Sequence, residues 1–210
     1  ILDLSATYRK GVRGYAAEPF SELKENEGWN ARTYHLYSHA GTHLDAPKHF
    51  IRGGATLESM DLAKLVGPAR CVDCGVRGPG EPLSGAELKT AAGTVLEGER
   101  VLFRTGWSRF RESDAFRENL PGLLVDAAEW LAGRKPALVG VEPPSVAPLE
   151  DYPVLRKVHE VLLAEDIVIV EGLVNLELLP VRPFEIAVLP LKIEGGDGSP
   201  ARAVARWRDG

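Results

Sequence analysis

The sequence predicts an α/β (α+β) domain built on a mixed sheet. Expected strands outnumber expected helices, and the two alternate as β-α-β only in the second half of the chain. A hydrophobic fraction of 44% and a charged fraction of 26% are typical of a folded globular protein. A chain of 210 residues is long enough for one core, so we expect a single domain over residues 1–210.

The first half of the chain predicts short strands and one helix. Residues 8–30 are polar and contain several glycines, which predicts a long loop. Ser84 and Glu87 match a capping box, so a short helix begins there and ends near Gly93. The apolar and alternating stretches predict strands at residues 1–4, 31–37, 68–76 and 100–105.

The second half alternates helices with apolar strands. Residues 125–133 predict a helix that buries Leu131 and ends at Gly133. Pro153 begins a second helix, which runs to about residue 164 with an apolar stripe. Strands are expected at residues 137–141, 167–170, 184–193 and 201–207. Pro190 falls within the third of these and predicts an edge or bulged strand.

Charge and cysteine content limit the classes of function. The net charge is −5 with both signs mixed along the chain, so we expect no nucleic-acid or membrane partner. The apolar run at 167–170 is too short to span a bilayer, and no signal peptide is expected. Cys71 and Cys74 have C-x-x-C spacing, but no second pair exists, which favours reduced thiols over a zinc knuckle or redox pair. We therefore expect a cytoplasmic protein.

The most informative feature is a cluster of histidines. Four of the five histidines, His35, His39, His43 and His49, lie within fifteen residues, together with Asp45. Histidine is the commonest metal ligand and the commonest acid/base near neutral pH. Two histidines and one carboxylate can form a catalytic zinc site that leaves a position for water. We interpret the cluster as a metal site and His35, on the preceding strand, as structural.

The cluster requires a bent backbone. Residues 39, 43, 45 and 49 would share one face of a strand, but a straight strand separates His39 from His43 by about 13 Å. Gly41 permits a tight turn and Pro47 fixes a second bend, so we expect a bent loop at the end of a strand. His159 and Glu171 form a second candidate pair. From their positions alone, a functional pair and an ordinary half-buried histidine with a strand-end charge are equally consistent with the sequence.

The segment from Ser38 to Phe50 resembles the H-x-G-T-H-x-D-x-P-x-H signature of the cyclase-like metal hydrolases, a family that includes the bacterial kynurenine formamidases. The resemblance extends over most of the chain. Further similar stretches are residues 103–107, 139–142, 171–176, 189–192 and 195–200. The first loop departs from the family pattern, because residues 11–19 lack the usual aromatic-Pro-Gly segment.

The resemblance implies a swivelling β/β/α fold and a divalent metal centre with one or two zinc ions, with manganese as an alternative. It implies that His39, His43 and Asp45 bind the first metal, and that Asp45 bridges to a second metal held by His159 and Glu171. It assigns His49 as the catalytic acid/base. It also implies a homodimer or homotetramer whose neighbouring subunits shape the pocket.

The implied reaction is hydrolysis of the C–N bond of a small amide, of the arylformamidase type that converts N-formylkynurenine to kynurenine and formate. Three alternatives remain: a cyclic-amide (isatin-like) hydrolase, a non-hydrolytic polyketide-type cyclase, and a binding module with a structural metal. An aryl substrate needs an aromatic wall. The candidates are Tyr15, Phe20, Trp29 and Phe50, although each is more often simple core.

Overall fold

In the computed structural model, residues 1–25 and 27–208 are described. Within them the main sheet contains eight strands, namely β1 (Leu2–Asp3), β4 (His43–Asp45), β5 (Val66–Asp73), β6 (Arg100–Arg104), β7 (Leu138–Val141), β8 (Val168–Glu171), β9 (Phe184–Pro190) and β10 (Gly198–Arg206). Their order is β1-β10-β4-β8-β7-β6-β5-β9, and β9 also pairs with β10, so the sheet closes on itself. β5 to β8 are mutually parallel and the other pairings are antiparallel. The predicted mixed α/β sheet is therefore confirmed.

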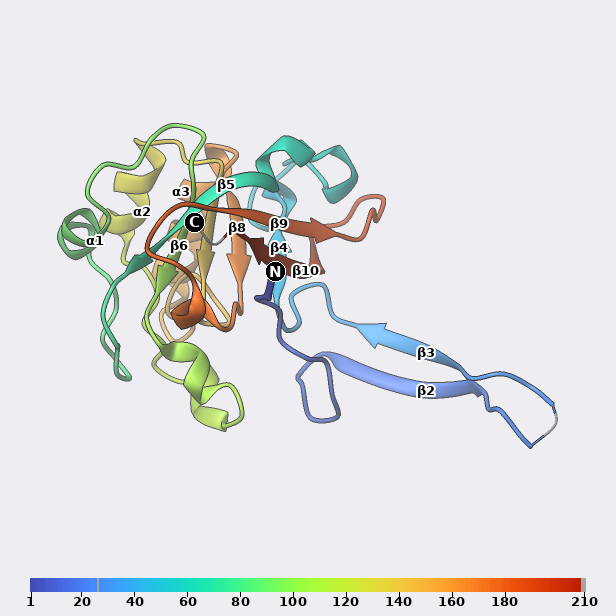
Figure 1. The fold of residues 1–210 in the computed structure, drawn as a ribbon. Coiled ribbons are helices and arrows are strands. Elements are labelled where there is room, and N and C mark those ends of the chain that lie inside the picture. Colours follow the sequence, from blue (N-terminus) through green and yellow to red (C-terminus); the bar gives the residue numbers. More distant parts are fainter. Residues whose placement is uncertain (26, 209–210) are drawn as a thin grey trace.

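Three helices cover one side of the parallel strands (Figure 1). They are α1 (Gly85–Ala92), α2 (Val125–Ala132) and α3 (Tyr152–Ala164). α1 begins at the predicted capping box of Ser84 and Glu87 and ends at Gly93. α2 ends at Gly133, as predicted. Each helix connects two consecutive parallel strands, so the β-α-β alternation begins at β5 and not only in the second half of the chain. No helix within the described residues is long and apolar enough to span a membrane.

Alternate residues of the sheet face two separate cores. In β6, Val101 packs against the helices, whereas Leu102 faces the interior enclosed by the strands. In β8, Ile169 lies on the helix side and Val170 in the interior. Because side chains alternate along a strand, Glu171 returns to the helix side at the end of β8. This alternation brings a buried carboxylate to the face covered by α3.

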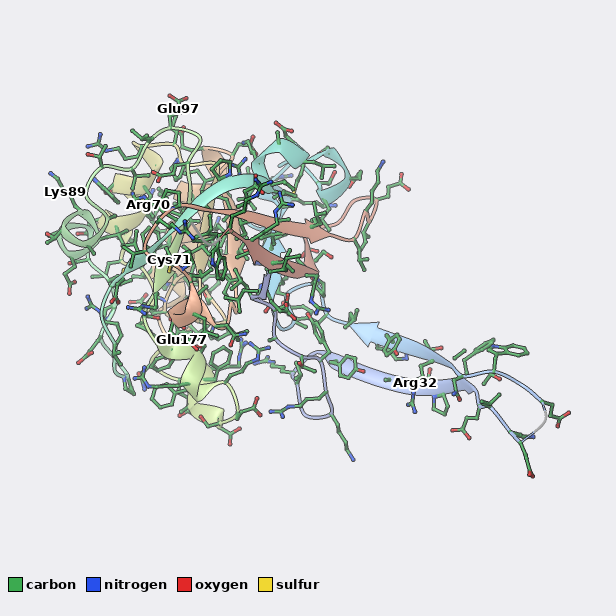
Figure 2. The ribbon with its side chains drawn as sticks, in the orientation of Figure 1. Arg32, Arg70, Cys71, Lys89, Glu97 and Glu177 are labelled. Carbon is green, nitrogen blue, oxygen red and sulfur yellow. The ribbon has the colours of Figure 1, made fainter. Side chains whose placement is uncertain are left out.

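The prediction of a loop over residues 8–30 is wrong in part. β2 (Tyr15–Ser21) pairs with β3 (Ala31–Leu36) as a two-stranded antiparallel arm that projects from the body (Figure 1). Arg32, on β3, lies on the projecting part of the arm, away from the body (Figure 2). The sequence signal was weak because the arm has no buried face, so apolar residues do not alternate strictly along it.

The prediction of an edge or bulged strand over residues 184–193 is wrong for residues 184–187, which pair with β5 in the sheet's interior. β9 has β5 on one side and β10 on the other, and it ends at Pro190. The pairing with β5 stops at Ala187, so Pro190 has only β10 beside it. Proline has no backbone N–H, and Pro190 therefore lies where no hydrogen bond to a second neighbouring strand is lost.

Candidate metal centre

Two bends bring the histidine cluster together around the short strand β4. Gly41 has φ +63°, and a Cβ there would lie 2.7 Å from the ring of Tyr8, so both the turn and the space require glycine. Pro47 begins a 3-10 helix, Pro47–His49, which turns His49 back toward the strand. The cluster is thus a strand between two turns, where the sequence predicted a bent loop.

β4 places two candidate ligands on one face. Leu44 lies in the interior core, so His43 and Asp45 point to the opposite side, toward α3. Both side chains are almost fully buried, at 1% and 0% exposure. His39, just before the Gly41 turn, joins them with Nδ1 2.8 Å from Oδ1 of Asp45.

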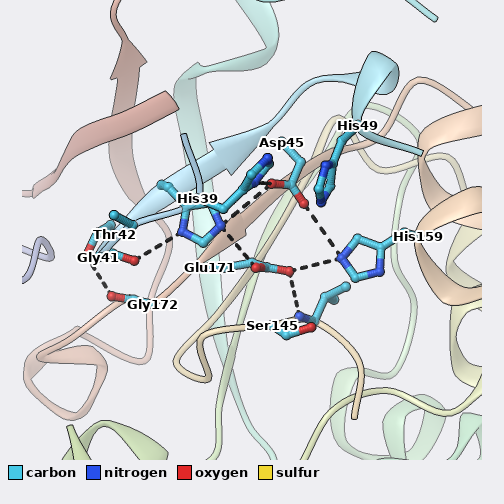
Figure 3. Close-up of polar contacts among 12 residues, drawn as sticks. His39, Gly41, Thr42, Asp45, His49, Ser145, His159, Glu171 and Gly172 are labelled. Carbon is cyan, nitrogen blue, oxygen red and sulfur yellow. Dashed lines mark hydrogen bonds and ion pairs between the residues drawn. The ribbon is translucent and has the colours of Figure 1, made fainter. Parts of the chain in front are cut away.

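His159 and Glu171 complete this group from other elements. Nε2 of His159, on α3, lies 3.3 Å from Oε1 of Glu171 and 3.7 Å from Oδ2 of Asp45. Oε2 of Glu171 lies 3.1 Å from Nε2 of His43. Figure 3 shows Asp45, His159 and Glu171 pointing toward one another. The structure therefore brings together all five residues that the resemblance assigned to the metals.

The hydrogen bonds of two imidazoles leave lone pairs aimed into this group. Nδ1 of His43 lies 3.1 Å from the carbonyl oxygen of Gly41, and Nδ1 of His159 lies 2.7 Å from that of Leu155. When Nδ1–H donates to a carbonyl, Nε2 carries a lone pair and is an acceptor. Nε2 of His43 and Oδ2 of Asp45 are both buried without a hydrogen-bond partner. Buried acceptors that face one another are unfavourable unless a cation lies between them.

The spacing of these atoms suits a metal ion. Ligands of one tetrahedral zinc ion, with bonds of roughly 2.0–2.1 Å, lie roughly 3.3 Å apart. The separations around Asp45, His43, His159 and Glu171 are between 3.1 and 3.7 Å. The donor set of imidazole and carboxylate is also one that zinc prefers. The residues present therefore fit one or two divalent ions.

The protein environment shifts the pKa values of this group. Burial would raise the pKa of Glu171, but the neighbouring imidazoles of His159 and His43 outweigh it and lower the pKa well below its usual range. Burial would lower the pKa of His39, yet Asp45 and Asp197 raise it to about 9. The raised pKa of His39 reports the negative charge of the neighbouring carboxylates, which attracts a cation.

His49 lies at the edge of the group. Its ring stacks on that of His39, with centroids 3.8 Å apart, and its other face is open enough to leave 23% of the side chain exposed. Burial lowers the pKa of His49, so the ring is neutral near pH 7. Phe50, one of the aromatic residues predicted as a substrate wall, contacts the rings of both His49 and His159 and so reaches the site. Tyr15 and Phe20 lie on the arm instead.

Asp197 belongs to the site although the sequence reasoning gave it no role. Its Oδ2 lies 3.0 Å from Nε2 of His39 and 3.8 Å from Nδ1 of His49. It sits in the turn between β9 and β10, next to Gly198, which pairs with Asp45. The only signal was the Gly-Gly-Asp-Gly stretch, which indicated a turn and not the strand pairing that brings it to β4.

The remaining candidates lie outside the centre. His35 is on the arm, where Nε2 lies 3.1 Å from Oε1 of Glu18, in agreement with its structural interpretation. Cys71 and Cys74 are free thiols that contact different cores on either side of the sheet. Burial raises the pKa of each to about 12. The expectation of two reduced thiols is therefore consistent with the structure.

Known proteins are similar to this chain in sequence and in fold. The chain is 39% identical to a kynurenine formamidase from Salinibacter ruber over 84% of this chain and 80% of that protein. A structure described as a potential metal-dependent hydrolase with cyclase activity has a TM-score of 0.76 at 28% identity, covering 97% of this chain and 96% of that one. Isatin hydrolase A from Labrenzia aggregata has a TM-score of 0.86 at 25% identity, covering 97% and 92%.

A family model described as putative cyclase matches residues 2–148, which include the histidine signature and β4 to β7. This match and the formamidase relative agree with the resemblance that the signature indicated. Each covers most of the chain. The chain therefore belongs to the putative cyclase family of hydrolytic enzymes.

Proposed function

We propose that this enzyme is a metal-dependent amidohydrolase of the arylformamidase type, which cleaves the C–N bond of a formyl-anilide such as N-formylkynurenine. The observation that carries the proposal is the pair of buried acceptors without hydrogen bonds, Nε2 of His43 and Oδ2 of Asp45, beside Glu171 and His159. The similarity to a kynurenine formamidase supports the choice of a linear aryl amide.

The proposed ion is zinc, with manganese as an alternative. His39, His43 and Asp45 would hold the first ion, and Asp45, His159 and Glu171 the second. A bound zinc ion is a Lewis acid that polarises a carbonyl and makes water a stronger nucleophile near pH 7. The protein residues around it fix the imidazole tautomers through Gly41 and Leu155.

His49 is the proposed catalytic acid/base. Its neutral ring can accept a proton from the attacking water and then donate it to the leaving amine nitrogen. The stacking contact with His39 and the edge contact with Phe50 hold the ring in place, and Asp197 lies close enough to stabilise it while it is charged. Cleavage thus yields formate and a free aryl amine.

A second candidate is hydrolysis of a cyclic amide. The fold similarity to isatin hydrolase A, with a TM-score of 0.86, favours it over a non-hydrolytic cyclase. A substrate panel decides between the two: the zinc-loaded protein is given N-formylkynurenine, formanilide and isatin. Faster turnover of the linear amides supports the proposal, and turnover of isatin alone overturns it in favour of the cyclic substrate.

The proposed assembly is a homodimer or homotetramer in the cytoplasm. An isolated two-stranded hairpin is only marginally stable in water, so the arm is expected to gain stability from a partner. The exposed fractions of Phe20, Trp29 and Tyr34 are 74%, 63% and 58%. Exposed aromatic side chains on a projecting arm are typical of a contact surface. A second copy of the chain is the proposed partner. The low cysteine content, two residues in the chain, supports the proposed location in a reducing compartment.

A further inference from the structure

A cavity of about 630 Å³ opens beside the candidate metal centre. It shares His39 and Gly41 with the centre, and its other walls come from the first loop and from the segment that follows β6. The charged residues of the lining are Arg9, Lys10, Arg13, Arg111, Glu112, Asp114 and Arg117. Five cationic side chains thus face two carboxylates, although the whole chain has a net charge of −5. Such a local excess of positive charge favours an anionic ligand.

The two carboxylates do not cancel this charge. Glu112 forms an ion pair with Arg9 at the rim, so these two side chains neutralise each other. Asp114 is exposed to solvent, which screens its charge. Arg111 donates one weak hydrogen bond, at 3.4 Å, to the carbonyl oxygen of Gly172 and lies over the ring of Phe116. Its other N–H groups remain for a ligand.

Arg117 is the least satisfied charge in the cavity. Among the described residues no hydrogen bond or ion pair is formed by its guanidinium, although the side chain is half-buried. Burial and the nearby Arg13 lower its pKa and outweigh the opposite effect of Glu171, but a guanidinium stays charged at neutral pH. A half-buried charge without a partner costs free energy that an anionic ligand would recover.

The segment that carries Arg111 and Arg117 is held in place. Trp107 is fully buried and its indole N–H donates to the carbonyl oxygen of Phe116, at 3.0 Å. At the start of the segment the buried carboxylate of Glu142 accepts the backbone N–H of Thr105 at 2.6 Å. The two guanidinium groups are therefore presented from a fixed turn, which reduces the entropy lost on binding.

We propose that Arg117, with Arg111 in the same cavity, binds a carboxylate of the substrate and makes the enzyme selective for formyl-anilides that carry an anionic side chain. The inference rests on the proposed function for the reacting amide, which would lie near His39 while the carboxylate lies in the cavity. The fork of a guanidinium matches the two oxygens of a carboxylate, so Arg117 is the specificity-determining residue.

The test compares a charged substrate with its neutral isostere. The zinc-loaded enzyme and its Arg117→Met variant are assayed with 3-(2-formamidophenyl)propanoate and the corresponding propanamide. We expect the variant to raise KM about tenfold or more for the carboxylate and to leave KM for the amide within about twofold. Arg117→Lys should recover part of the loss. Arg134→Met, an exposed arginine far from the cavity, is the matched control.

A binding measurement separates this inference from the proposed function. Calorimetry with 3-phenylpropanoate and 3-phenylpropanamide requires no hydrolysis, so it decides the role of Arg117 even when neither formyl-anilide is cleaved. Preference of the wild-type protein for the carboxylate, lost in Arg117→Met, supports the inference. Equal binding of both compounds by the wild-type protein, an unchanged preference in the variant, or equal losses for both substrates would overturn it.

Discussion

Nε2 of His159 lies 3.3 Å from Oε1 of Glu171. His159 is in the second half of α3, and Glu171 is the last residue of β8, the strand that follows this helix. α3 presents His159 on its buried face, and the chain returns along β8 to place Glu171 beside it. The backbone N–H of Val146 donates to the same carboxylate oxygen, at 2.6 Å. A buried carboxylate is thus held at a fixed point beside Asp45 and His159.

Removing the charge of Glu171 should empty the proposed second metal position. Glu171→Gln keeps the shape of the side chain but weakens a ligand shared with His159, so zinc bound per chain should fall from two toward one. Elemental analysis of dialysed protein measures this. Glu177→Gln, an exposed change six residues along the chain, is the control. Identical zinc content in the two variants would remove Glu171 from the site.

His49 should be required for turnover but not for metal binding. We expect His49→Ala to lower kcat by about 10²–10⁴-fold, because the proton carrier is lost, while zinc content stays the same. Steady-state kinetics and elemental analysis on one sample provide both values. His35→Ala, on the exposed arm, should leave both unchanged. Loss of zinc from His49→Ala would instead make His49 a ligand.

Gly198 leaves room for the ring of His39. A Cβ at this position would lie 2.5 Å from Cε1 of His39, so Gly198→Ala should displace the ring from Asp45. We expect zinc affinity to fall about 10–100-fold, as is usual when the groups that orient a ligand are disturbed. Competition with a fluorescent chelator measures the affinity. Gly133→Ala has only ordinary contacts and should have no effect; a similar affinity in both variants would contradict the account.

The arm should control assembly. Replacing two exposed aromatics, Trp29→Ser with Tyr34→Ser, should shift the protein from dimer or tetramer toward monomer, because apolar contact area is lost. Sedimentation velocity at several concentrations measures the distribution. Val181→Ser removes a fully exposed apolar residue from the body and should leave assembly intact. A wild-type monomer would contradict the proposed contact.

The two cysteines should react slowly while the protein is folded. Their pKa of about 12, against an ordinary value of 9.0, means that the thiolate fraction near pH 8 is about 10³-fold lower than in the unfolded chain. Since folding raises these pKa values, the unfolded state loses its thiol protons first, and stability should decrease as pH rises from 9 toward 12. Thiol titration with and without denaturant measures the reactivity; rapid native reaction would contradict burial as the cause.

The local part of the site could be predicted from the sequence. His39, His43, Asp45 and His49 lie close together because Gly41 and Pro47 bend a short stretch of chain, and both bends are visible in the residue types. Long-range partners are different. Nothing in local periodicity indicates that Glu171 would face His43 across the pairing of β4 with β8, and only the family resemblance joined them.

The features that the sequence did not indicate depend on tertiary pairing. Asp197 reaches His39 because β10 pairs with β4, a contact between segments more than 150 residues apart. Closure of the sheet through β9 and β10 depends on a register that no single strand specifies. The arm of β2 and β3 was hidden because neither strand has a buried face in the single chain.

The central claim is that the buried group around Asp45 holds the ion on which hydrolysis depends. Its most direct test adds zinc stepwise to metal-free protein while bound zinc and formanilide hydrolysis are measured on the same samples. We expect activity to start near zero, to rise with bound zinc and to reach its maximum at no more than two ions per chain. Full activity in the metal-free protein, or zinc uptake that neither changes activity nor is abolished by His43→Ala, would contradict it.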